Sequence, residues 1–364
     1  MRQTKFSIAI LVLFLSIVLA ACSVDSEAAD ARSTKAGKST TVYDYLSREV
    51  VIPDKVERIA CLYAFTGHVV TMLGEGDKIV AVNNGLQRDN LLNEINPVIS
   101  DAVVPNRGDK INIEELANIG PDLIFIQEST AKDEGEVRKL DELNIPYLVV
   151  NFNSIEEQQQ AIAMIGKAIG RSREAERYID FYNDIIAQVS EGVKNIPEKY
   201  RIRVYHSVNE ATRTDAAGSL PAEWMKIAGV TNVSVGENLK LTDGKYFANL
   251  EQILLWNPEA ILVNEDGVSD YILSNPQWET LQAVKNKKVY QLPNGVSRWG
   301  HPGGLETPLA ILWTAKTLYP DKFSEVNMEE VTGEFYQDFF NYKLDEDYIA
   351  KILSGKNMRI PKGN

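Results

Sequence analysis

Three arginines lie in predicted loops, where their side chains can bind an anion. Arg107 precedes a repeated segment described below, whereas Arg213 and Arg298 each follow a predicted strand. A planar guanidinium group binds carboxylates, catecholates and oxyanions through paired hydrogen bonds. We therefore expect Arg107, Arg213 and Arg298 to bind a ligand, with loop capping as the alternative role for each.

Four aromatic side chains are candidates for packing against an aromatic or macrocyclic ligand. They are Tyr63, Phe65, Tyr205 and Trp299. The segment with Tyr63 and Phe65 also contains Thr66 and opens a predicted helix, where backbone N–H groups can meet an anion. Packing in the core is the alternative role of these residues.

The chain has three histidines, of which His301 is the best placed to contact a ligand or its metal. His68 falls in a predicted helix and His206 in a predicted strand, so both are expected to be structural. No cluster of histidines and acids has metal-ligand spacing, and we predict no dedicated metal site. Signatures of hydrolases, metalloproteases and nucleotide-binding loops are also missing from the sequence.

Short apolar runs alternate with longer amphipathic ones, a pattern typical of parallel sheets covered by helices. This pattern predicts the α/β class. The predicted strands are 58–63, 78–82, 123–127 and 147–151 in the first half, and 203–207, 260–264 and 288–292 in the second. The segment 172–195 has an apolar face at helical spacing, and we expect one long helix there.

The two halves share a repeated segment. Asn112-Ile113-Glu114-Glu115-Leu116 and a following Pro-Asp strand match Asn249-Leu250-Glu251-Gln252-Ile253 and a following Pro-Glu strand, at a constant offset. Each unit predicts a short helix, an acidic turn and a buried strand. We interpret the repeat as two similar α/β lobes around a cleft, with two unrelated helix–strand units as the alternative.

The N-terminus has the pattern of an export signal. Arg2 and Lys5 precede an uncharged stretch that ends in Leu19-Ala20-Ala21-Cys22. This pattern resembles the bacterial lipobox, which implies cleavage before Cys22 and attachment of lipid to its sulfur. We expect a signal peptide over 1–21 and a flexible tether over 22–41. The other cysteine, Cys61, is expected to be a buried thiol.

The remaining domain boundaries follow from these elements. We expect an N-terminal lobe over 42–170, a linking helix over 171–197, and a C-terminal lobe with C-terminal helices over 198–364. The 364 residues are 44% hydrophobic and carry a formal charge of −13. A chain this acidic, without a basic stripe, is not expected to bind nucleic acid.

Over residues 42–325 the sequence resembles the cluster A-II, or class III, periplasmic binding proteins. The resemblance consists of an ordered series of features. It begins with the turn Leu73-Gly74-Glu75-Gly76-Asp77 before a strand and continues through the two repeated segments and the long helix. It ends with Trp299-Gly300-His301-Pro302 before Glu306-Thr307-Pro308. The family implies two Rossmann-like lobes joined by one long α-helix, with the ligand cleft between them.

The resemblance also implies a function. Members of this family are lipid-anchored substrate-binding proteins in the cell envelope that deliver ferric siderophores, haem or cobalamin to an ABC permease and its ATPase. The family uses one acidic residue on each lobe to dock the permease, and Glu114 and Glu251 fall at the matching positions. We expect a monomer without a cofactor whose cargo is a ferric siderophore, with haem, cobalamin, molybdate or tungstate as alternatives. A chelatase-like enzyme and a surface adhesin are the alternatives from other classes.

Overall fold

The computed structural model describes residues 39–360, which belong to one compact unit. The predicted signal peptide, Cys22 and all but the last three residues of the predicted tether lie outside the described residues. The first strand, β1 (Thr40–Tyr43), begins two residues before the expected start of the N-terminal lobe. It pairs with β2 (Glu49–Ile52) in an antiparallel hairpin. Within 39–360, no helix is long and apolar enough to cross a membrane.

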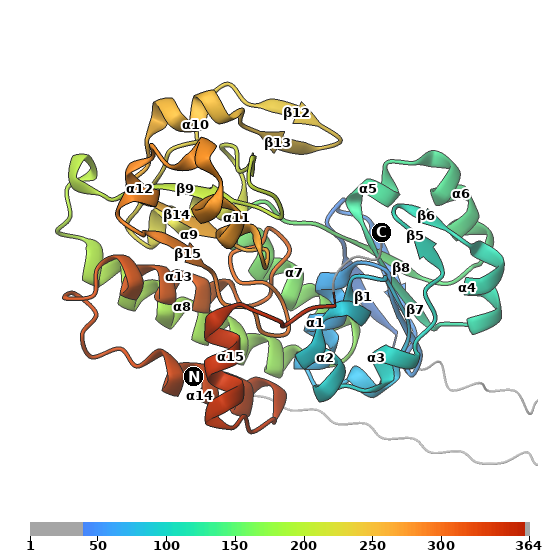
Figure 1. Cartoon of the computed structure of the whole chain (residues 1–364). Helices are drawn as coiled ribbons and strands as arrows, with labels where there is room; N and C mark the ends of the chain where they lie inside the picture. The colour runs from blue at the N-terminus through green and yellow to red at the C-terminus, as the bar shows by residue number, and fades with distance from the viewer. Residues whose placement is uncertain (1–38, 361–364) are drawn as a thin grey trace, which may run out of the picture. The chain divides into compact units, whose positions relative to one another are not determined.

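The first lobe is built on a parallel four-stranded sheet with the strand order β4-β3-β7-β8 (Figure 1). Its strands are β3 (Ile59–Cys61), β4 (Ile79–Val82), β7 (Leu123–Gln127) and β8 (Tyr147–Val150). Its helices are α1 (Ala64–Met72), α2 (Asn90–Ile95), α3 (Val98–Asp101), α4 (Ile113–Ile119), α5 (Glu128–Ala131), α6 (Glu134–Glu142) and α7 (Ile155–Ala168). A small hairpin joins β5 (Asn106–Arg107) and β6 (Lys110–Ile111). All four strands predicted for this half are confirmed.

The second lobe repeats this topology with the order β11-β9-β14-β15. Its strands are β9 (Arg203–Ser207), β11 (Thr231–Asn232), β14 (Ala260–Val263) and β15 (Val289–Gln291). Its first helices are α9 (Leu220–Ile227), α10 (Leu250–Trp256), α11 (Val268–Ser274) and α12 (Gln282–Lys285). A separate antiparallel sheet contains β10 (Arg213–Thr214), β13 (Lys245–Phe247) and β12 (Lys240–Thr242). In both parallel sheets, the strand that comes first in the chain lies between the second and the third.

The repeated segments adopt matching structures in the two lobes. Asn112 caps α4 by accepting from Glu115 N at 3.2 Å, and Asn249 caps α10 by accepting from Gln252 N at 2.8 Å. Both helices end at a residue with a left-handed backbone conformation, and each leads into the third strand of its sheet. The two-lobe interpretation of the repeat is therefore confirmed.

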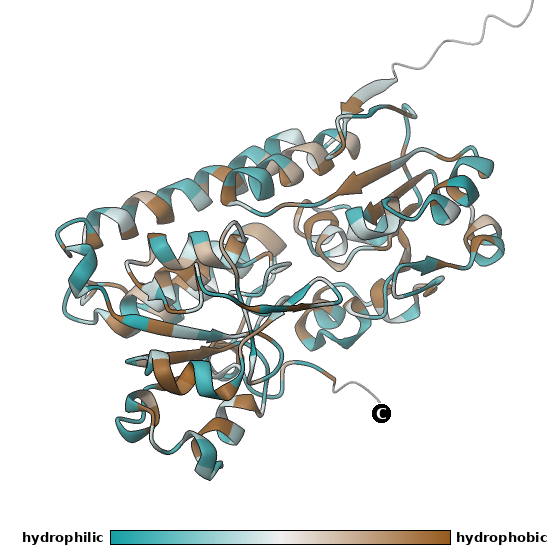
Figure 2. Ribbon diagram, turned by 90° about the horizontal axis from the view of Figure 1, so that it is seen from above, coloured by the Kyte–Doolittle hydropathy of each residue, from teal (hydrophilic) through white to brown (hydrophobic). Residues whose placement is uncertain are grey.

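The linking helix is α8 (Ser172–Val193), within the predicted range. At ~1.5 Å per residue it extends about 33 Å, and Tyr178, Tyr182 and Ile185 lie on its buried face. The same apolar cluster contains Cys61 of β3 and Leu262 of β14, so the two lobes share one continuous core. Figure 2 shows some strands in the apolar colour along most of their length, whereas the helices carry both colours. As expected, Cys61 is buried, and burial raises the pKa of its thiol to about 12.

The C-terminal helices and the segments that follow them contact the first lobe as well as the second. They are α13 (Thr307–Leu318), α14 (Met328–Phe340) and α15 (Glu346–Ser354). Beyond α14, Tyr342 Oη donates to Glu94 Oε1 of the first lobe at 2.5 Å. After α15 the chain returns to the first lobe, where Asn90 N donates to Met358 O at 3.1 Å. The sequence analysis expected C-terminal helices but did not predict these contacts with the first lobe.

Candidate functional site

A cavity of about 280 Å³ lies where loops of both lobes meet the C-terminal segment. Arg88 follows β4 in the first lobe, Arg298 follows β15 in the second, and Arg359 follows α15. The cavity is lined by Arg88, Glu265, Asp266, Gly267, Asn294, Arg298, Arg359 and Ile360. Open α/β sheets bind ligands beyond the carboxyl ends of their strands, which makes this cavity the candidate site.

Asn209 joins the second-lobe loops that border the cavity. It follows β9, and its backbone N donates to Asn264 Oδ1, just after β14, at 2.9 Å. Its own Oδ1 accepts from Arg298 Nη1, and the same nitrogen of Arg298 forms an ion pair with Glu265. These contacts orient the Arg298 side chain at the cavity wall.

The loop between β15 and α13 is held by the buried carboxylate of Glu306. This group accepts from the backbone N of Val296 at 3.0 Å and from that of Ser297 at 2.8 Å. It also accepts from the hydroxyls of Ser297 and Tyr336. Burial nevertheless raises the pKa of Glu306, with the hydroxyl of Ser297 opposing the shift. A loop fixed at this point presents Arg298 and His301 in a defined position.

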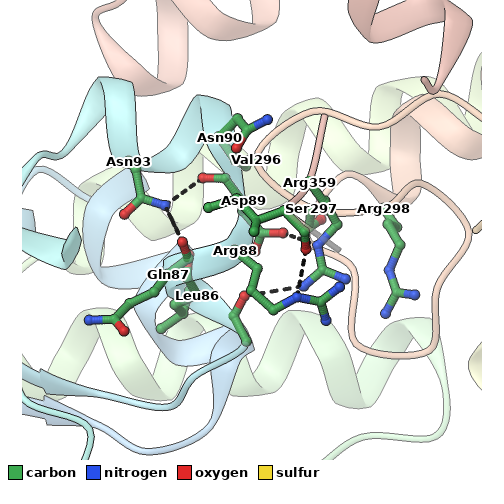
Figure 3. Close-up of polar contacts among 12 residues, drawn as sticks. Leu86, Gln87, Arg88, Asp89, Asn90, Asn93, Val296, Ser297, Arg298 and Arg359 are labelled. Atoms are coloured by element: carbon green, nitrogen blue, oxygen red, sulfur yellow. Dashed lines mark hydrogen bonds and ion pairs between the residues drawn. The ribbon is translucent and has the colours of Figure 1, made fainter. Parts of the chain in front are cut away.

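Arg359 and Arg88 meet on the first-lobe side of the cavity (Figure 3). Arg359 Nε donates to Asp89 Oδ1, and Arg88 Nε donates to the carbonyl of Ile360 at 2.8 Å. Among residues 39–360, no carboxylate lies within 4.0 Å of the Arg88 guanidinium nitrogens. The charge of Arg88 is therefore not neutralised by a direct ion pair in this part of the chain.

The positive charge of Arg359 lowers the pKa of two neighbouring arginines at this site. Burial and the nearby charge of Arg359 lower the pKa of Arg298 to about 10, against the opposing effect of Glu265. Burial and the charge of Arg359 also lower the pKa of Arg88. An anion placed between these side chains would offset both effects.

His301 lies beside this cluster as a neutral ring. Burial, followed by the charges of Arg298 and Arg213, lowers its pKa well below the ordinary value of 6.5. Its Nδ1 accepts from Gly303 N at 3.1 Å, so the proton of the neutral ring is on Nε2. His301 can thus donate a hydrogen bond to an anion without being charged.

The predicted ligand-binding roles of Phe65, Thr66, Tyr205 and Trp299 are not supported, because all four are fully buried in cores or caps. Phe65 packs on Phe152, with ring centroids 4.5 Å apart. The Thr66 hydroxyl donates to Tyr63 O at 2.7 Å, within the first turn of α1. Tyr205 and Trp299 belong to the apolar clusters of the second lobe and of the shared core, respectively.

The other predicted site residues lie in different surroundings. Tyr63 is half-buried at the start of α1, and its hydroxyl lies 3.2 Å from the place that a Cβ on Gly303 would occupy, near His301. Arg213 is half-buried in β10, close enough to His301 to affect its pKa. Arg107 is exposed on the β5–β6 hairpin and does not line the cavity.

Two cavity arginines, Arg88 and Arg359, were missed by the sequence analysis. Arg88 follows a predicted strand at the same edge as the other candidates, so its position was a usable signal. Arg359 gave no such signal, because its contact with Asp89 joins residues 270 positions apart.

A second cavity of about 270 Å³ lies between the β1–β2 hairpin and α7. Its charged lining residues are Asp44 and Glu157, with no arginine or lysine. It therefore has no cationic side chain to attract an anion. Over residues 39–360, no group of three or more histidines, cysteines and acids is arranged to hold a metal ion.

Glu114 and Glu251 occupy equivalent exposed places in the two lobes. Each lies in the first turn of its helix, one residue after the first helical position. Neither forms an ion pair within the described residues. Both carboxylates are accessible to a partner.

Comparisons with known proteins agree with this architecture. A family model described as "Periplasmic binding protein" matches residues 59–296. A molybdate-binding protein of Haemophilus influenzae is 24% identical over 85% of this chain and 93% of its own length. An uncharacterised ABC transporter substrate-binding lipoprotein of Bacillus subtilis is 25% identical over 86% of this chain and 96% of its own length.

A solved structure of the Haemophilus influenzae molybdate-binding protein with molybdate bound has a TM-score of 0.75. The two are 22% identical, and the match covers 84% of this chain and 99% of that chain, a similarity that concerns the fold. More distant relatives are named for iron uptake, vitamin B12 binding and iron(3+)-hydroxamate binding.

Proposed function

We propose that this chain captures a compact anion in its interlobe cavity. The chain belongs to the periplasmic binding protein family and is the substrate-binding protein of an ABC transporter. The family consists of binding proteins rather than enzymes, and the chain's contribution to transport is affinity and docking. The arginine-lined cavity is the observation that carries the choice of cargo.

The chemistry of the lining favours an anion. Arg88 and Arg298 each use only part of their N–H groups within the described residues, and both are partly desolvated. Guanidinium groups with free N–H donors bind oxyanions through paired, charge-assisted hydrogen bonds. Binding there would also offset the repulsion between the arginines.

The size of the cavity favours a compact cargo. Its volume of about 280 Å³ is near the lower end of the ~300–1,000 Å³ typical of ligand pockets. Three of the four side chains expected to stack on a macrocycle are buried, namely Phe65, Tyr205 and Trp299, and only Tyr63 is half-buried. Haem and cobalamin are therefore disfavoured, and a tetrahedral oxyanion such as molybdate or tungstate is the first candidate. The relative named for molybdate binding adds support.

An anionic ferric siderophore complex is the second candidate. Its carboxylate or catecholate oxygens would use the same guanidinium donors, and several relatives are named for iron. It requires a wider cleft than the cavity described here, so it ranks below an oxyanion.

Delivery to the permease is proposed to use Glu114 and Glu251. Two exposed carboxylates, one in each lobe, can set orientation on a basic partner surface. The lipobox pattern supports anchoring through Cys22 on the extracytoplasmic side of the membrane, and relatives named as lipoproteins agree with this.

The proposal is tested by calorimetric titration of the chain from residue 22 onward, with Cys22→Ser, against molybdate, tungstate, sulfate, a ferric siderophore, haem and cobalamin. We expect saturable one-to-one binding of an oxyanion, weakened ~10-fold or more in Arg88→Ala because a charged hydrogen bond is lost. Arg138→Ala, an exposed arginine of α6, is the matched control. Tight binding of haem or cobalamin with no response to any anion would contradict the proposal.

A further inference from the structure

The C-terminal segment Lys356–Ile360 bridges the two lobes at the edge of the cavity. On the second-lobe side, Lys356 Nζ forms an ion pair with Asp270 of α11 at 3.1 Å. The backbone N of Asn357 donates to Oδ2 of Asp266, a cavity residue, at 2.8 Å. These two contacts hold the start of the segment on the second lobe.

The rest of the segment is attached to the first lobe. Ile360 N donates to Arg88 O at 2.8 Å, and Asp89 and Arg359 form an antiparallel β-bridge. Met358, between the two attachments, is fully buried in the shared core. The segment is therefore an integral part of the cavity wall.

Arg359 is the one charged side chain that this segment places in the cavity lining. Its Nε donates to Asp89 Oδ1 and its Nη2 donates to Gly85 O at 3.1 Å. Asp89 also contacts His68 Nε2, at 3.3 Å. Within residues 39–360 Arg359 Nη1 has no hydrogen-bond partner, so the guanidinium is oriented by two acceptors and retains free N–H donors.

We propose that Arg359 is an anion-binding residue of the interlobe cavity, oriented by Asp89 and carried into place by the segment Lys356–Ile360. This proposal rests on the proposed function of the same site. It adds a third arginine, from a part of the chain that follows the region matched by the family model. The ligand would then contact the first lobe, the second lobe and the C-terminal segment together, through Arg88, Arg298 and Arg359.

The alternative role for Arg359 is purely structural, as a clamp on Asp89. The two roles differ in what Arg359→Lys would do. A lysine keeps a positive charge for Asp89 but loses the planar, paired donors that an oxyanion requires. If Arg359 is only structural, Arg359→Lys should bind the anion as tightly as the unsubstituted chain. If Arg359 binds the ligand, Arg359→Lys should bind the anion more weakly.

The test measures affinity and stability in the same four proteins: the unsubstituted chain, Arg359→Lys, Arg359→Ala and Arg177→Ala. Arg177 is a matched control, because it also pairs with an aspartate, Asp338 at 3.2 Å, but lies on α8 outside the cavity lining. Calorimetry with molybdate and tungstate gives the affinity, and thermal melting without ligand gives the stability of each variant.

We expect Arg359→Lys to bind oxyanion ~10-fold or more weakly than the unsubstituted chain, with a ligand-free melting temperature close to that of the control. Arg359→Ala should bind more weakly still. Unchanged affinity in Arg359→Lys, or a loss in Arg359→Ala no larger than in Arg177→Ala, would overturn this proposal while leaving the proposed function intact. If the unsubstituted chain binds no anion, the proposed function itself fails, and this proposal fails with it.

Discussion

Arg298 has a structural role in the loops at the cavity, and we propose that the same side chain binds the anion. Its contacts with Asn209 and Glu265 join loops that follow three different strands. Its pKa is lowered to about 10, mainly by burial. Such a buried, partly paired cation is stabilised by an anion that supplies the missing hydrogen bonds.

The first prediction concerns this side chain. Arg298→Ala should weaken oxyanion binding ~10- to 100-fold, because a charged hydrogen bond in a buried site contributes about 1.5–3 kcal/mol. The oxyanion affinity of Arg298→Lys should lie between those of Arg298→Ala and the unsubstituted chain, because lysine keeps the charge but lacks the paired hydrogen-bond donors. Calorimetric titration with molybdate measures both. Equal affinity in all three proteins would remove Arg298 from the site.

The second prediction concerns His301 and pH. The folded protein holds the pKa of His301 well below 6.5, mainly by burial, whereas in the unfolded chain it should be near ~6.5. Below that pH the unfolded chain binds more protons, so the stability contribution of the neutral ring is complete above about pH 6.5 and is lost on acidification. The free energy of unfolding, measured with urea at several pH values, should therefore fall less steeply on acidification in His301→Asn than in the unsubstituted chain. The difference in slope should be up to ~1.4 kcal/mol per pH unit. Parallel pH profiles would show that His301 has an ordinary pKa.

At the residue scale, sequence position located some site residues and misplaced others. Arg298, predicted because it follows a strand and suits an anion, lines the candidate cavity, whereas His301 of the same loop is not among the lining residues. Trp299, between them in this loop, was misjudged, since only the packing against the shared core reveals that it points inward. Arg359 could not be found at all, because no local pattern reports a contact between the C-terminus and the first lobe.

At the element scale, the loop between β15 and α13 is the part of the site most constrained by its neighbours. Its backbone donates to Glu306, and Gly295 lies against the Glu306 and Tyr336 side chains. A Cβ at Gly295 would lie 1.7 Å from Tyr336 Oη and 2.1 Å from Glu306 Oε1. Only glycine fits this approach without displacing the hydrogen-bonded pair.

The third prediction follows from this close approach. Gly295→Ala should lower the free energy of unfolding by about 1–3 kcal/mol or more, as overpacking in a filled core does. Anion binding should weaken as well, because the loop carries Arg298. The control is Gly135→Ala in α6, where the Cβ would meet only the Asp133 side chain, at 3.1 Å. Urea unfolding of both variants measures the difference, and similar stability of the two would contradict this account of the loop.

Strands and helices were predicted more accurately than loops at this scale. Apolar runs located seven of the eight strands in the two parallel sheets to within about two residues at each end, because buried strands need continuous apolar sequence. They missed the two-residue strand β11 (Thr231–Asn232). The repeat predicted the matched helices α4 and α10, and the structure adds that an asparagine caps each of them. The loops depend on contacts with distant segments, which short-range patterns do not encode.

At the scale of the whole molecule, the lobes are coupled by more than the linking helix. They share an apolar cluster that includes α8 and α13, and the C-terminal segment makes hydrogen bonds to both lobes. Relative motion of the lobes would have to disturb these contacts. We therefore expect closure on binding to be small.

The fourth prediction separates capture of the cargo from delivery. Charge reversal at Glu114 and Glu251 should leave anion affinity unchanged but reduce stimulation of the transporter ATPase in proteoliposomes, because both carboxylates are exposed and outside the cavity. Glu134→Lys is the matched control, since Glu134 is also an exposed acid in the first turn of a helix. Full stimulation by the Glu114→Lys, Glu251→Lys double variant would contradict the docking proposal.

The most direct test of the central claim is a crystal structure of the chain grown with tungstate, with data collected at the tungsten absorption edge. The account predicts one strong anomalous peak in the interlobe cavity, within hydrogen-bond distance of the guanidinium groups of Arg88 and Arg298. A peak elsewhere on the molecule, or no peak at a saturating concentration of tungstate, would contradict the claim that this cavity binds a compact anion.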